Sequence, residues 1–278
     1  MIIPCRRLLT SSLTLYVNPN GSDTNDGLTP QTAFQTIQSA IVAFSSLYDT
    51  GSYNHTIKLA DGYYYGAALT EVTGGGSISI EGSGNTYVQG NIQVNQRRTR
   101  YQISNLIIIP DGTFGVSVSN GYLSIGGNIS FSIRRATTPA VLVAEKGGFL
   151  EVSSPFSLSF DSGVAISLAL AKSGGYISLG RPLSLSNPGA WTVAGLWAQS
   201  TGCIDAKGFT FTSTDSILGL RWLQESNGCI ISDGATSIPG NVNGANALLT
   251  ETLPPVTPEA RPKVGLKVIV TSASYSLA

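Results

Sequence analysis

The sequence has few of the residues on which metal and redox sites depend. Its 278 residues include one histidine, three cysteines and one methionine. A single histidine excludes histidine-rich metal sites and makes any Ser-His-Asp triad depend on His55, which we expect to be a polar residue at a strand terminus. Three cysteines are too few for a disulfide framework. Cys203 and Cys229 fall at the same position in adjacent coils, which would bring them within disulfide range, but we favour free thiols there. We therefore expect no metal and no cofactor.

Charge and long apolar runs are also scarce. Only 12% of the residues are charged, and 16 Lys and Arg balance 16 Asp and Glu. A nucleic acid or an anionic membrane surface normally needs a basic excess, so we expect neither partner. No run approaches eighteen apolar residues, which excludes a membrane-spanning helix. The first fifteen residues lack a continuous apolar core and a small-residue cleavage site, so we expect no signal peptide.

A repeat of about 27 residues organises the middle of the chain. Five glycines, separated by 27, 27, 27 and 26 residues, each begin a run in which apolar and polar residues alternate; they are Gly121, Gly148, Gly175, Gly202 and Gly228. Alternation with a period of two predicts a strand with one buried face. A fixed period in this range predicts a solenoid.

Each repeat contains three strand-like runs. One follows the glycine, and a second, with Ser or Thr outside, begins seven or eight residues after it. The third precedes the next glycine, and there we align Val116, Val143, Leu170, Trp197 and Leu223. The pattern predicts an all-β fold, a parallel β-helix with about 27 residues per coil and like residues stacked about 4.8 Å apart. Parallel crossovers favour a right-handed helix. A leucine-rich repeat is the competing solenoid, but the sequence contains no helical return.

The N-terminal part departs from the repeat. We expect residues 1–14 to form an arm, and residues 15–56 to supply a first strand, a turn-rich loop and an amphipathic helix. Thr29 and Pro30 favour a helix start there, and apolar residues follow at helical spacing, namely Phe34, Ile37, Ile41 and Phe44. This capping helix would cover the open end of the β-helix, which would otherwise expose strand edges.

The C-terminal part also departs from it. We expect the β-helix to span residues 57–238. Residues 239–278 begin with a proline-rich stretch, which predicts a linker. Alternation returns from residue 265 to residue 275 and predicts one final strand. A lone strand is not stable alone, so it must pair with the body of its own chain or with a neighbouring copy, and the second alternative makes this end a candidate oligomerisation element.

The segment from residue 15 to residue 65 resembles a known group of proteins. It carries Leu15-Tyr16-Val17-Asn18, Asn25-Asp26-Gly27, Pro30-Gln31-Thr32-Ala33-Phe34 and Asp61-Gly62-Tyr63-Tyr64. These motifs are similar to the opening of pectate-lyase-like right-handed parallel β-helix proteins, above all bacteriophage and prophage tail spikes and tail fibres. The resemblance implies a homotrimer in a virion, made in the bacterial cytoplasm. It further implies an N-terminal arm that contacts other virion proteins and a surface that contacts host polysaccharide.

One outward column of the repeat contains two acids. Ser124, Glu151, Ser178 and Asp205 fall at equivalent positions. Strand spacing would place Glu151 and Asp205 about 9–10 Å apart, near the upper limit of about 6.5–9.5 Å for the carboxyl groups of an inverting glycosidase. They are our candidate catalytic residues. The alternative is a solvated face with scattered acids, because no third acid and no Lys or Arg joins the column.

Two further columns run beside these acids. Tyr122, Phe149 and Tyr176 would form an aromatic ladder, which is either a platform for sugar binding or a structural stack. Glu145, Lys172, Gln199 and Glu225 form a second column, in which opposite charges on neighbouring rungs would help to set the register.

These observations leave two functional hypotheses. The first is a structural spike or fibre protein, a β-helical stalk or adhesin that contacts a cell-surface polysaccharide. The second is a polysaccharide hydrolase or lyase on the same fold. The scarcity of clustered acids and bases favours the first, although fold alone does not decide between them.

Overall fold

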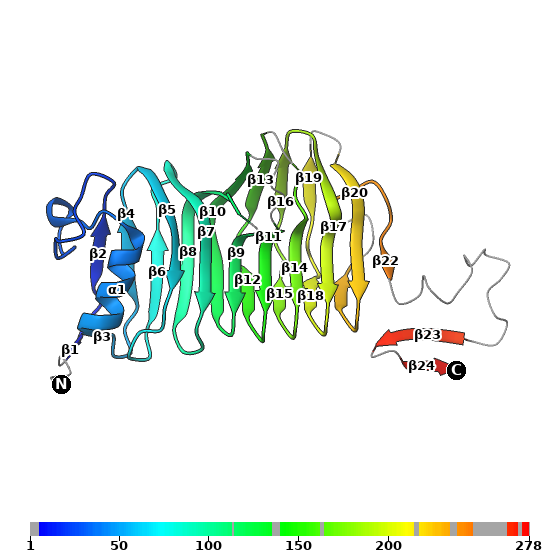
Figure 1. Ribbon diagram of the computed structural model, residues 1–278, viewed down its shortest axis with the longest axis horizontal. Helices are drawn as coiled ribbons and strands as arrows, with labels where there is room; N and C mark the ends of the chain where they lie inside the picture. Colours follow the sequence, from blue (N-terminus) through cyan, green and yellow to red (C-terminus); the bar gives the residue numbers. More distant parts are fainter. Residues whose placement is uncertain are drawn as a thin grey trace.

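The computed structural model describes residues 6–112, 114–134, 140–161, 164–213, 217–233, 238–246, 266–271 and 274–277. The chain forms a parallel β-solenoid of about six turns with a spacing of about 26 residues, and one α-helix lies near the N-terminus. Figure 1 shows the coils stacked along the long axis of the molecule, with the helix at the N-terminal end. The all-β, parallel β-helix fold predicted from the repeat is therefore confirmed.

Three parallel ladders of strands run along the solenoid. The first contains β2 (Thr14–Val17), β4 (His55–Leu59), β6 (Ser77–Glu81), the first halves of β8 (Arg100–Ile109) and β10 (Tyr122–Ile133), β12 (Phe149–Val152), β15 (Tyr176–Ser178), β18 (Cys203–Ala206) and β21 (Cys229–Ser232). The second contains the first halves of β5 (Gly62–Leu69) and β7 (Thr86–Asn95), the second halves of β8 and β10, β13 (Phe156–Phe160), β16 (Leu183–Ser186) and β19 (Phe211–Ser213). The third contains the second halves of β5 and β7, β9 (Phe114–Ser119), β11 (Ala140–Glu145), β14 (Ser167–Lys172), β17 (Gly189–Gln199), β20 (Ile217–Glu225) and β22 (Ala245–Asn246).

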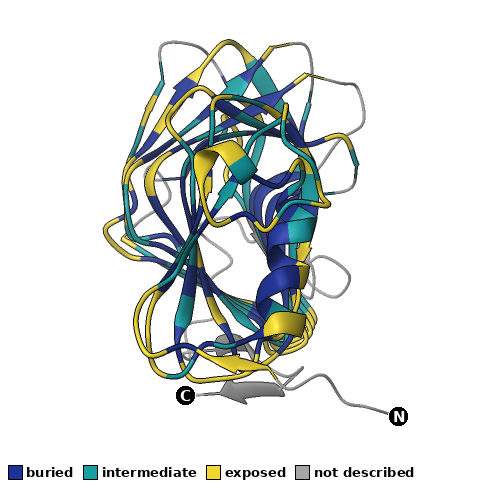
Figure 2. Ribbon diagram, turned by 90° about the vertical axis from the view of Figure 1, so that its left-hand side faces the viewer, coloured by how far each residue is buried: buried dark blue, intermediate teal, exposed yellow. Residues whose placement is uncertain are grey.

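The core lies inside the coils and is built from like residues on neighbouring rungs. Leu150, Ile177 and Ile204 are Cα partners in β12, β15 and β18, and none of the three side chains is exposed. Figure 2, which looks at the N-terminal end, shows buried residues along the strands and on part of α1, and exposed residues mainly in the connecting turns. The alternation in the sequence thus predicted the inward face correctly, because a strand of period two has only two possible orientations.

A tight turn precedes the repeated glycine in each of the later coils. In the turn before Gly175, Ser173 and Gly174 both have positive φ angles, and the Gly175 N–H donates to the Lys172 carbonyl at 2.9 Å. Two consecutive left-handed residues closed by such a bond form a turn of the hairpin type, which favours Gly or Asn. A Cβ on Gly175 would overlap the backbone of Ala144 in the preceding coil. The glycine therefore recurs because the coils approach each other closely at this point.

Replacing Thr201 with glycine should stabilise the protein by about 1 kcal/mol. Thr201 has a φ of 66°, and the left-handed conformation costs an L-residue about 1–2 kcal/mol, partly offset by the greater flexibility of glycine in the unfolded chain. Gly147 and Gly174 occupy the equivalent turn position in other coils. Urea denaturation should give a higher midpoint for Thr201→Gly and a lower one for the reverse change, Gly174→Thr. Equal midpoints would contradict the assigned turn.

The capping helix begins later than we predicted. Thr29 caps a short 3₁₀ helix, η1 (Pro30–Thr32), and the α-helix α1 (Ile37–Leu47) begins after a second cap at Thr36. Phe34 lies between the two helices and exchanges backbone hydrogen bonds with β2, since its N–H donates to the Tyr16 carbonyl at 2.9 Å. The prediction of one helix from Thr29 was wrong because two capping sequences follow one another and the chain between them pairs with a strand.

The helix covers the end of the solenoid by occupying a strand position. Its buried residues, Ile37, Ala40, Ile41, Ala43 and Phe44, join the core. The Gln38 side chain donates to the Ala68 carbonyl at 3.3 Å and accepts from the Ala68 N–H at 3.0 Å, so an amide side chain pairs with the free edge of β5. The outer edge of β2 pairs with the preceding loop, since the Tyr16 N–H donates to the Gly27 carbonyl at 2.8 Å. The helix and the loop therefore pair backbone groups at two edges of the N-terminal end of the solenoid.

Short strand pairs occur near both termini. Within the expected arm, β1 (Arg7–Leu8) pairs in parallel with β3 (Tyr48–Asp49), so this part of the arm is docked beside the C-terminal end of α1. At the other end, β23 (Leu266–Thr271) and β24 (Ser274–Leu277) form an antiparallel pair. The expected single final strand is therefore wrong, because the alternating segment pairs with itself. Residues 247–265, which contain most of the expected linker, lie outside the described residues.

Candidate functional site

The two candidate catalytic acids lie on one outward column, as their spacing predicted. Glu151 pairs with Ser178 between β12 and β15, and Ser178 pairs with Asp205 between β15 and β18. The two carboxylates are therefore two rungs apart, which corresponds to about 9–10 Å at the usual strand spacing. Both residues are half-buried.

A tyrosine holds each carboxylate from the preceding coil. The Tyr122 phenol donates a short hydrogen bond to Glu151 Oε2, and the Tyr176 phenol donates to Asp205 Oδ2 at 3.2 Å. Burial raises the pKa of Tyr122, and the hydrogen bond to Glu151 raises it further. Burial and the charge of Asp205 raise the pKa of Tyr176 in the same way. Each phenol therefore stays protonated and remains a donor, so that one oxygen of each carboxylate is engaged within the protein.

The three aromatic residues stack face to face along the solenoid. The ring centroids of Tyr122 and Phe149 lie 5.5 Å apart, those of Phe149 and Tyr176 lie 5.0 Å apart, and both pairs are tilted by 14°. The Arg100 guanidinium lies over the Tyr122 ring, 5.4 Å from its centroid, and Cys203 follows Tyr176 on the next rung. A sugar stacks on an open ring face, and these faces are turned toward neighbouring rungs. The geometry favours a structural role, while sugar binding by this ladder stays a prediction.

The charged column sets up one close ion pair. Lys172 Nζ lies 3.0 Å from Glu145 Oε2 on the neighbouring rung. Glu225, two rungs beyond Lys172, instead accepts a hydrogen bond from the Trp197 indole N–H at 2.7 Å. These contacts agree with a role in holding the coils in register.

One alignment in the third ladder was wrong. Val143, Leu170, Trp197 and Leu223 are in register, but Val116 pairs with Leu142 rather than with Val143. All of residues 140–144 are buried, so the apolar run has no alternation to show which residues face inward. Val143 and Leu170 form a small second cluster, against which the half-buried Trp197 packs, outside the main core.

His55 has a structural role. Its Nδ1 accepts a hydrogen bond from the Leu13 N–H at 3.0 Å, and its Nε2 lies 3.0 Å from the Thr50 carbonyl oxygen, to which it donates. The ring is buried at the start of β4, beside Phe44. Both ring nitrogens are thus engaged with backbone groups, and the expectation of a polar residue at a strand terminus is confirmed.

A surface of exposed tyrosines was missed in the sequence. Tyr65 is 80% exposed, and Tyr63, which is 62% exposed, stacks on Tyr87 of the next coil with ring centroids 4.6 Å apart. Tyr65 borders a hollow of about 310 Å³ whose polar lining comes from Gln89, Asn91, Gln93 and Asp111. The signal was present, because alternation within Gly62-Tyr-Tyr-Tyr-Gly66 turns Tyr63 and Tyr65 outward when Tyr64 faces the core.

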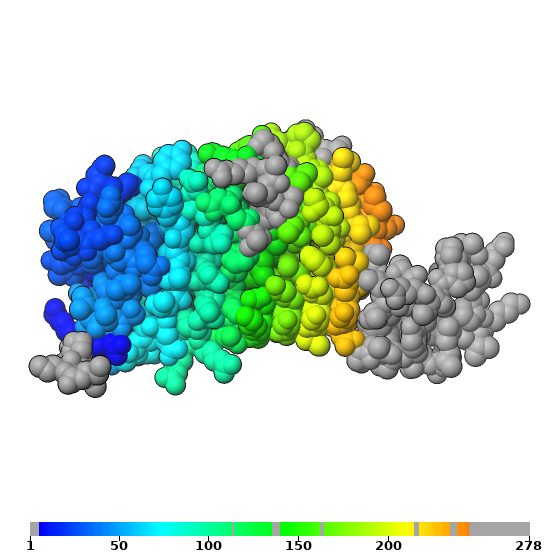
Figure 3. Space-filling view, in the orientation of Figure 1, coloured from blue at the N-terminus to red at the C-terminus, as the bar shows by residue number. Residues whose placement is uncertain are grey.

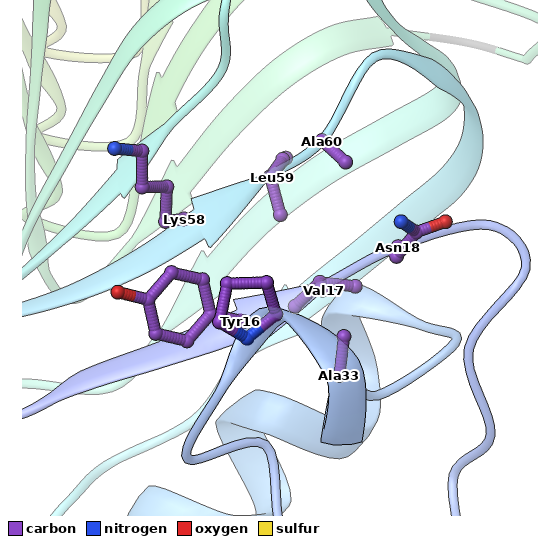
Figure 4. A pocket seen from close by; sticks show the side chains of 8 residues that line it. Tyr16, Val17, Asn18, Ala33, Lys58, Leu59 and Ala60 are labelled. Atoms are coloured by element: carbon purple, nitrogen blue, oxygen red, sulfur yellow. The ribbon is translucent and has the colours of Figure 1, made fainter.

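A second, largely apolar hollow of about 240 Å³ lies under the N-terminal cap. It is lined by Tyr16, Val17, Asn18, Pro30, Ala33, Lys58, Leu59 and Ala60. Figure 4 shows the Tyr16 and Lys58 side chains directed to one side of it and Asn18 to the other. No pair of acid and base groups converges there, so we assign it to the packing of the cap against the first coil.

The fold defines the protein as a parallel β-solenoid. No protein-family model, no curated protein and no solved structure matches the chain. Among the described residues, no three His, Cys, Asp or Glu side chains gather as metal ligands would. The residues that the structure describes also form no helix that is long and apolar enough to cross a membrane.

The stability of the protein should fall as the pH rises above about 10, the usual pKa of tyrosine. Burial raises the pKa of Tyr101 well above this value, so Tyr101 ionises in the unfolded chain before it ionises in the folded one. The contribution of Tyr101 to the free energy of unfolding is therefore complete below about pH 10 and is lost at higher pH. Urea midpoints measured from pH 8 to pH 12 should fall less steeply for Tyr101→Phe. An identical slope for both proteins would contradict this assignment.

Proposed function

We propose that the protein is a structural appendage of a phage or phage-derived particle, a β-helical stalk or adhesin that contacts a host cell-surface polysaccharide. The observation that supports contact with sugars best is the pair of exposed tyrosines, Tyr63 and Tyr65, beside a hollow lined by amides and a carboxylate. The solenoid supplies a rigid, elongated support on which such a surface is held (Figure 3).

The chemistry of this surface suits a pyranose ring. The C–H groups of a sugar pack against an open aromatic face, and Tyr65 offers one. Side-chain amides both donate to and accept from hydroxyl groups, whereas carboxylates accept from them, and Gln89, Asn91 and Asp111 line the adjoining hollow. Asn91 Oδ1 has no hydrogen-bond partner within the described residues. That oxygen is itself buried, so a ligand would be recognised through the partly exposed Gln89 and Gln93 and the exposed Asp111.

Retention of labelled bacterial capsular, cell-wall and pectic polysaccharides by the immobilised protein tests the proposal. At least one polysaccharide should bind, and Tyr65→Ala should weaken that binding about tenfold, since loss of one stacking contact of about 1.4 kcal/mol corresponds to that factor. Tyr53 is 41% exposed and lies away from this hollow, so Tyr53→Ala is the matched control. Equal binding by the two variants, or no binding by the native protein, would contradict the proposal.

A polysaccharide-cleaving enzyme is the second candidate. It is supported by the shared column of Glu151 and Asp205, whose spacing of about 9–10 Å is near that of an inverting glycosidase. The stalk hypothesis predicts no release of reducing ends or unsaturated sugars from the bound polysaccharide. Release that disappears in Glu151→Gln would decide for the enzyme.

The assembly belongs to the same proposal. The resemblance implies a homotrimer in a virion and contacts between the N-terminal arm and other virion proteins. Because β23 and β24 pair with each other, an unpaired terminal strand no longer supports the trimer. Sedimentation of the full chain at micromolar concentration should give three times the 29.0 kDa mass of one chain. A monomer would contradict this part of the proposal.

A further inference from the structure

Four cations gather around one hollow on the surface of this neutral protein. A hollow of about 410 Å³ is lined by Arg97, Arg98, Arg100, Asn120, Gly121, Tyr122, Lys146 and Gly147. Four of the 16 Lys and Arg residues therefore line a single site. In Figure 3, groups coloured as the segment near residue 100 project from the lower edge of the molecule. Net charge alone gives no indication of such a site, because it averages over the whole surface.

The loop that carries two of these cations is rigidly built. Gln96 is buried, and its Oε1 accepts from the N–H groups of Arg98 and Thr99, both at 2.8 Å. Its Nε2 donates to the Thr99 carbonyl at 2.6 Å, and the Thr99 hydroxyl accepts from the Val72 N–H at 2.9 Å. The buried amide thus fixes the turn from which Arg97 and Arg98 extend into solvent. A fixed loop loses less entropy when a ligand binds.

The acids nearby neutralise the hollow only in part. Arg98 Nε lies 3.5 Å from Glu71 Oε1, and both side chains are exposed, so this pair is weak. Lys146 Nζ lies 3.8 Å from Glu145 Oε1, but the other oxygen of Glu145 is closer to Lys172, at 3.0 Å.

The remaining two cations are not neutralised in this way. Within the described residues, Arg97 and Arg100 form no ion pair with a carboxylate. Arg100 instead lies over the Tyr122 ring. The hollow therefore keeps an excess of positive charge, and an anion bound there would relieve the repulsion between like charges.

Lys146 lines this hollow from a backbone position in the left-handed region. Its φ is 52°, in the left-handed region, at the turn position that Ser173, Ser200 and Ser226 occupy in the later coils. The left-handed conformation belongs to the repeated turn, so what distinguishes this coil is the lysine at that position. The turn therefore places a cation two rungs from the loop that carries Arg97 and Arg98, since Asn95 pairs with Ser119 and Ser119 pairs with Glu145.

We propose that this hollow binds an oxyanion group, the carboxylate or phosphate carried by an acidic polysaccharide. Guanidinium groups bind the two oxygens of such a group with paired, charge-assisted hydrogen bonds. The polymeric nature of the ligand rests on the proposed function, whereas the oxyanion site rests on the four cations alone. The ligand would lie beside Tyr122 at the start of the aromatic ladder, separate from the hollow next to Tyr65.

Calorimetric titration of the full chain tests the site. The probes are trigalacturonate, inorganic phosphate and the neutral trisaccharide maltotriose, each at low salt. Trigalacturonate should bind, and the double variant Arg97→Gln/Arg98→Gln should bind it at least about tenfold more weakly, the factor that corresponds to 1.4 kcal/mol. Arg181 is exposed and lies away from the hollow. Arg181→Gln should therefore keep the affinity within about twofold, although it also removes a positive charge.

Each outcome of the titration bears on the proposal. Phosphate that binds as tightly as trigalacturonate, with the same loss in the double variant, supports the oxyanion site and identifies phosphate as the group recognised. An equal loss in Arg181→Gln, or no binding of either anion, overturns the proposal. The side chains changed in these variants are exposed, and the hydrogen bonds from Gln96 to the backbone do not involve them. The melting temperature of each variant should therefore equal that of the native protein. Retention of a neutral polysaccharide through Tyr65 would survive failure of the anion site, so the two proposals fail separately.

Discussion

Replacing Ile177 with alanine should lower the free energy of unfolding by about 2–5 kcal/mol, the usual cost of truncating a fully buried isoleucine. Ile177 is 0% exposed and is flanked in register by Leu150 and Ile204, which are equally buried. Backbone hydrogen bonds fix the distance between neighbouring coils. The coils therefore cannot move together to fill the cavity that the smaller side chain leaves. Urea denaturation followed by circular dichroism measures the effect.

The next residue along the strand provides the control. Ser178 belongs to the same strand, β15, but lies on its outward face between Glu151 and Asp205. Ser178→Ala should change the free energy of unfolding by no more than about 0.5 kcal/mol, as surface substitutions usually do. Similar losses in Ile177→Ala and Ser178→Ala would contradict the register on which the fold description rests.

Replacing Gly175 with alanine should cost more than about 3 kcal/mol, beyond the usual effect of an overpacked side chain, and should lower the yield of folded protein. The added Cβ would overlap the carbonyl group of Ala144 and lie 2.6 Å from the Glu145 backbone nitrogen. Both obstacles are backbone atoms of the preceding coil, which cannot move without separating two rungs of the solenoid. The thermal midpoint and the yield of soluble protein measure the loss.

The neighbouring glycine separates this effect from backbone strain. Gly174 has a φ of 77°, but the nearest atom to an added Cβ is 3.9 Å away, in open surroundings. Gly174→Ala should therefore cost only about 1–2 kcal/mol, the penalty of the left-handed conformation. If Gly174→Ala proved the more damaging of the two, close approach of the coils would not be the reason for the repeated glycine.

Much of the fold was predictable because the repeat supplies its own alignment. The recurring glycine anchors each coil, and strict alternation after it assigns Ile177 inward and Ser178 outward without ambiguity. For the same reason the column of Glu151 and Asp205 was predicted with the correct register. Where alternation was absent, as in the buried run of residues 140–144, the alignment slipped by one residue.

The remaining features depend on contacts that a one-dimensional pattern does not contain. The start of α1 at Ile37 was missed because the preceding residues pair with β2. The hollow between Arg97, Arg98 and Lys146 joins a loop held by Gln96 to a later coil, and only stacking of the coils brings them together. The sequence also does not show that the ring faces of the aromatic ladder are turned toward neighbouring rungs. That follows from the stacking geometry of Tyr122, Phe149 and Tyr176.

The most direct test of the stalk or adhesin proposal is to incubate the purified full-length protein with acidic and with neutral polysaccharides and to measure binding and cleavage in the same samples. A stalk or adhesin should retain the polysaccharide at its original length, with no new reducing ends or unsaturated sugars, and Glu151→Gln should bind it equally well. Shortening of the polysaccharide by the native protein but not by Glu151→Gln would contradict the account, as would failure to retain any acidic or neutral polysaccharide.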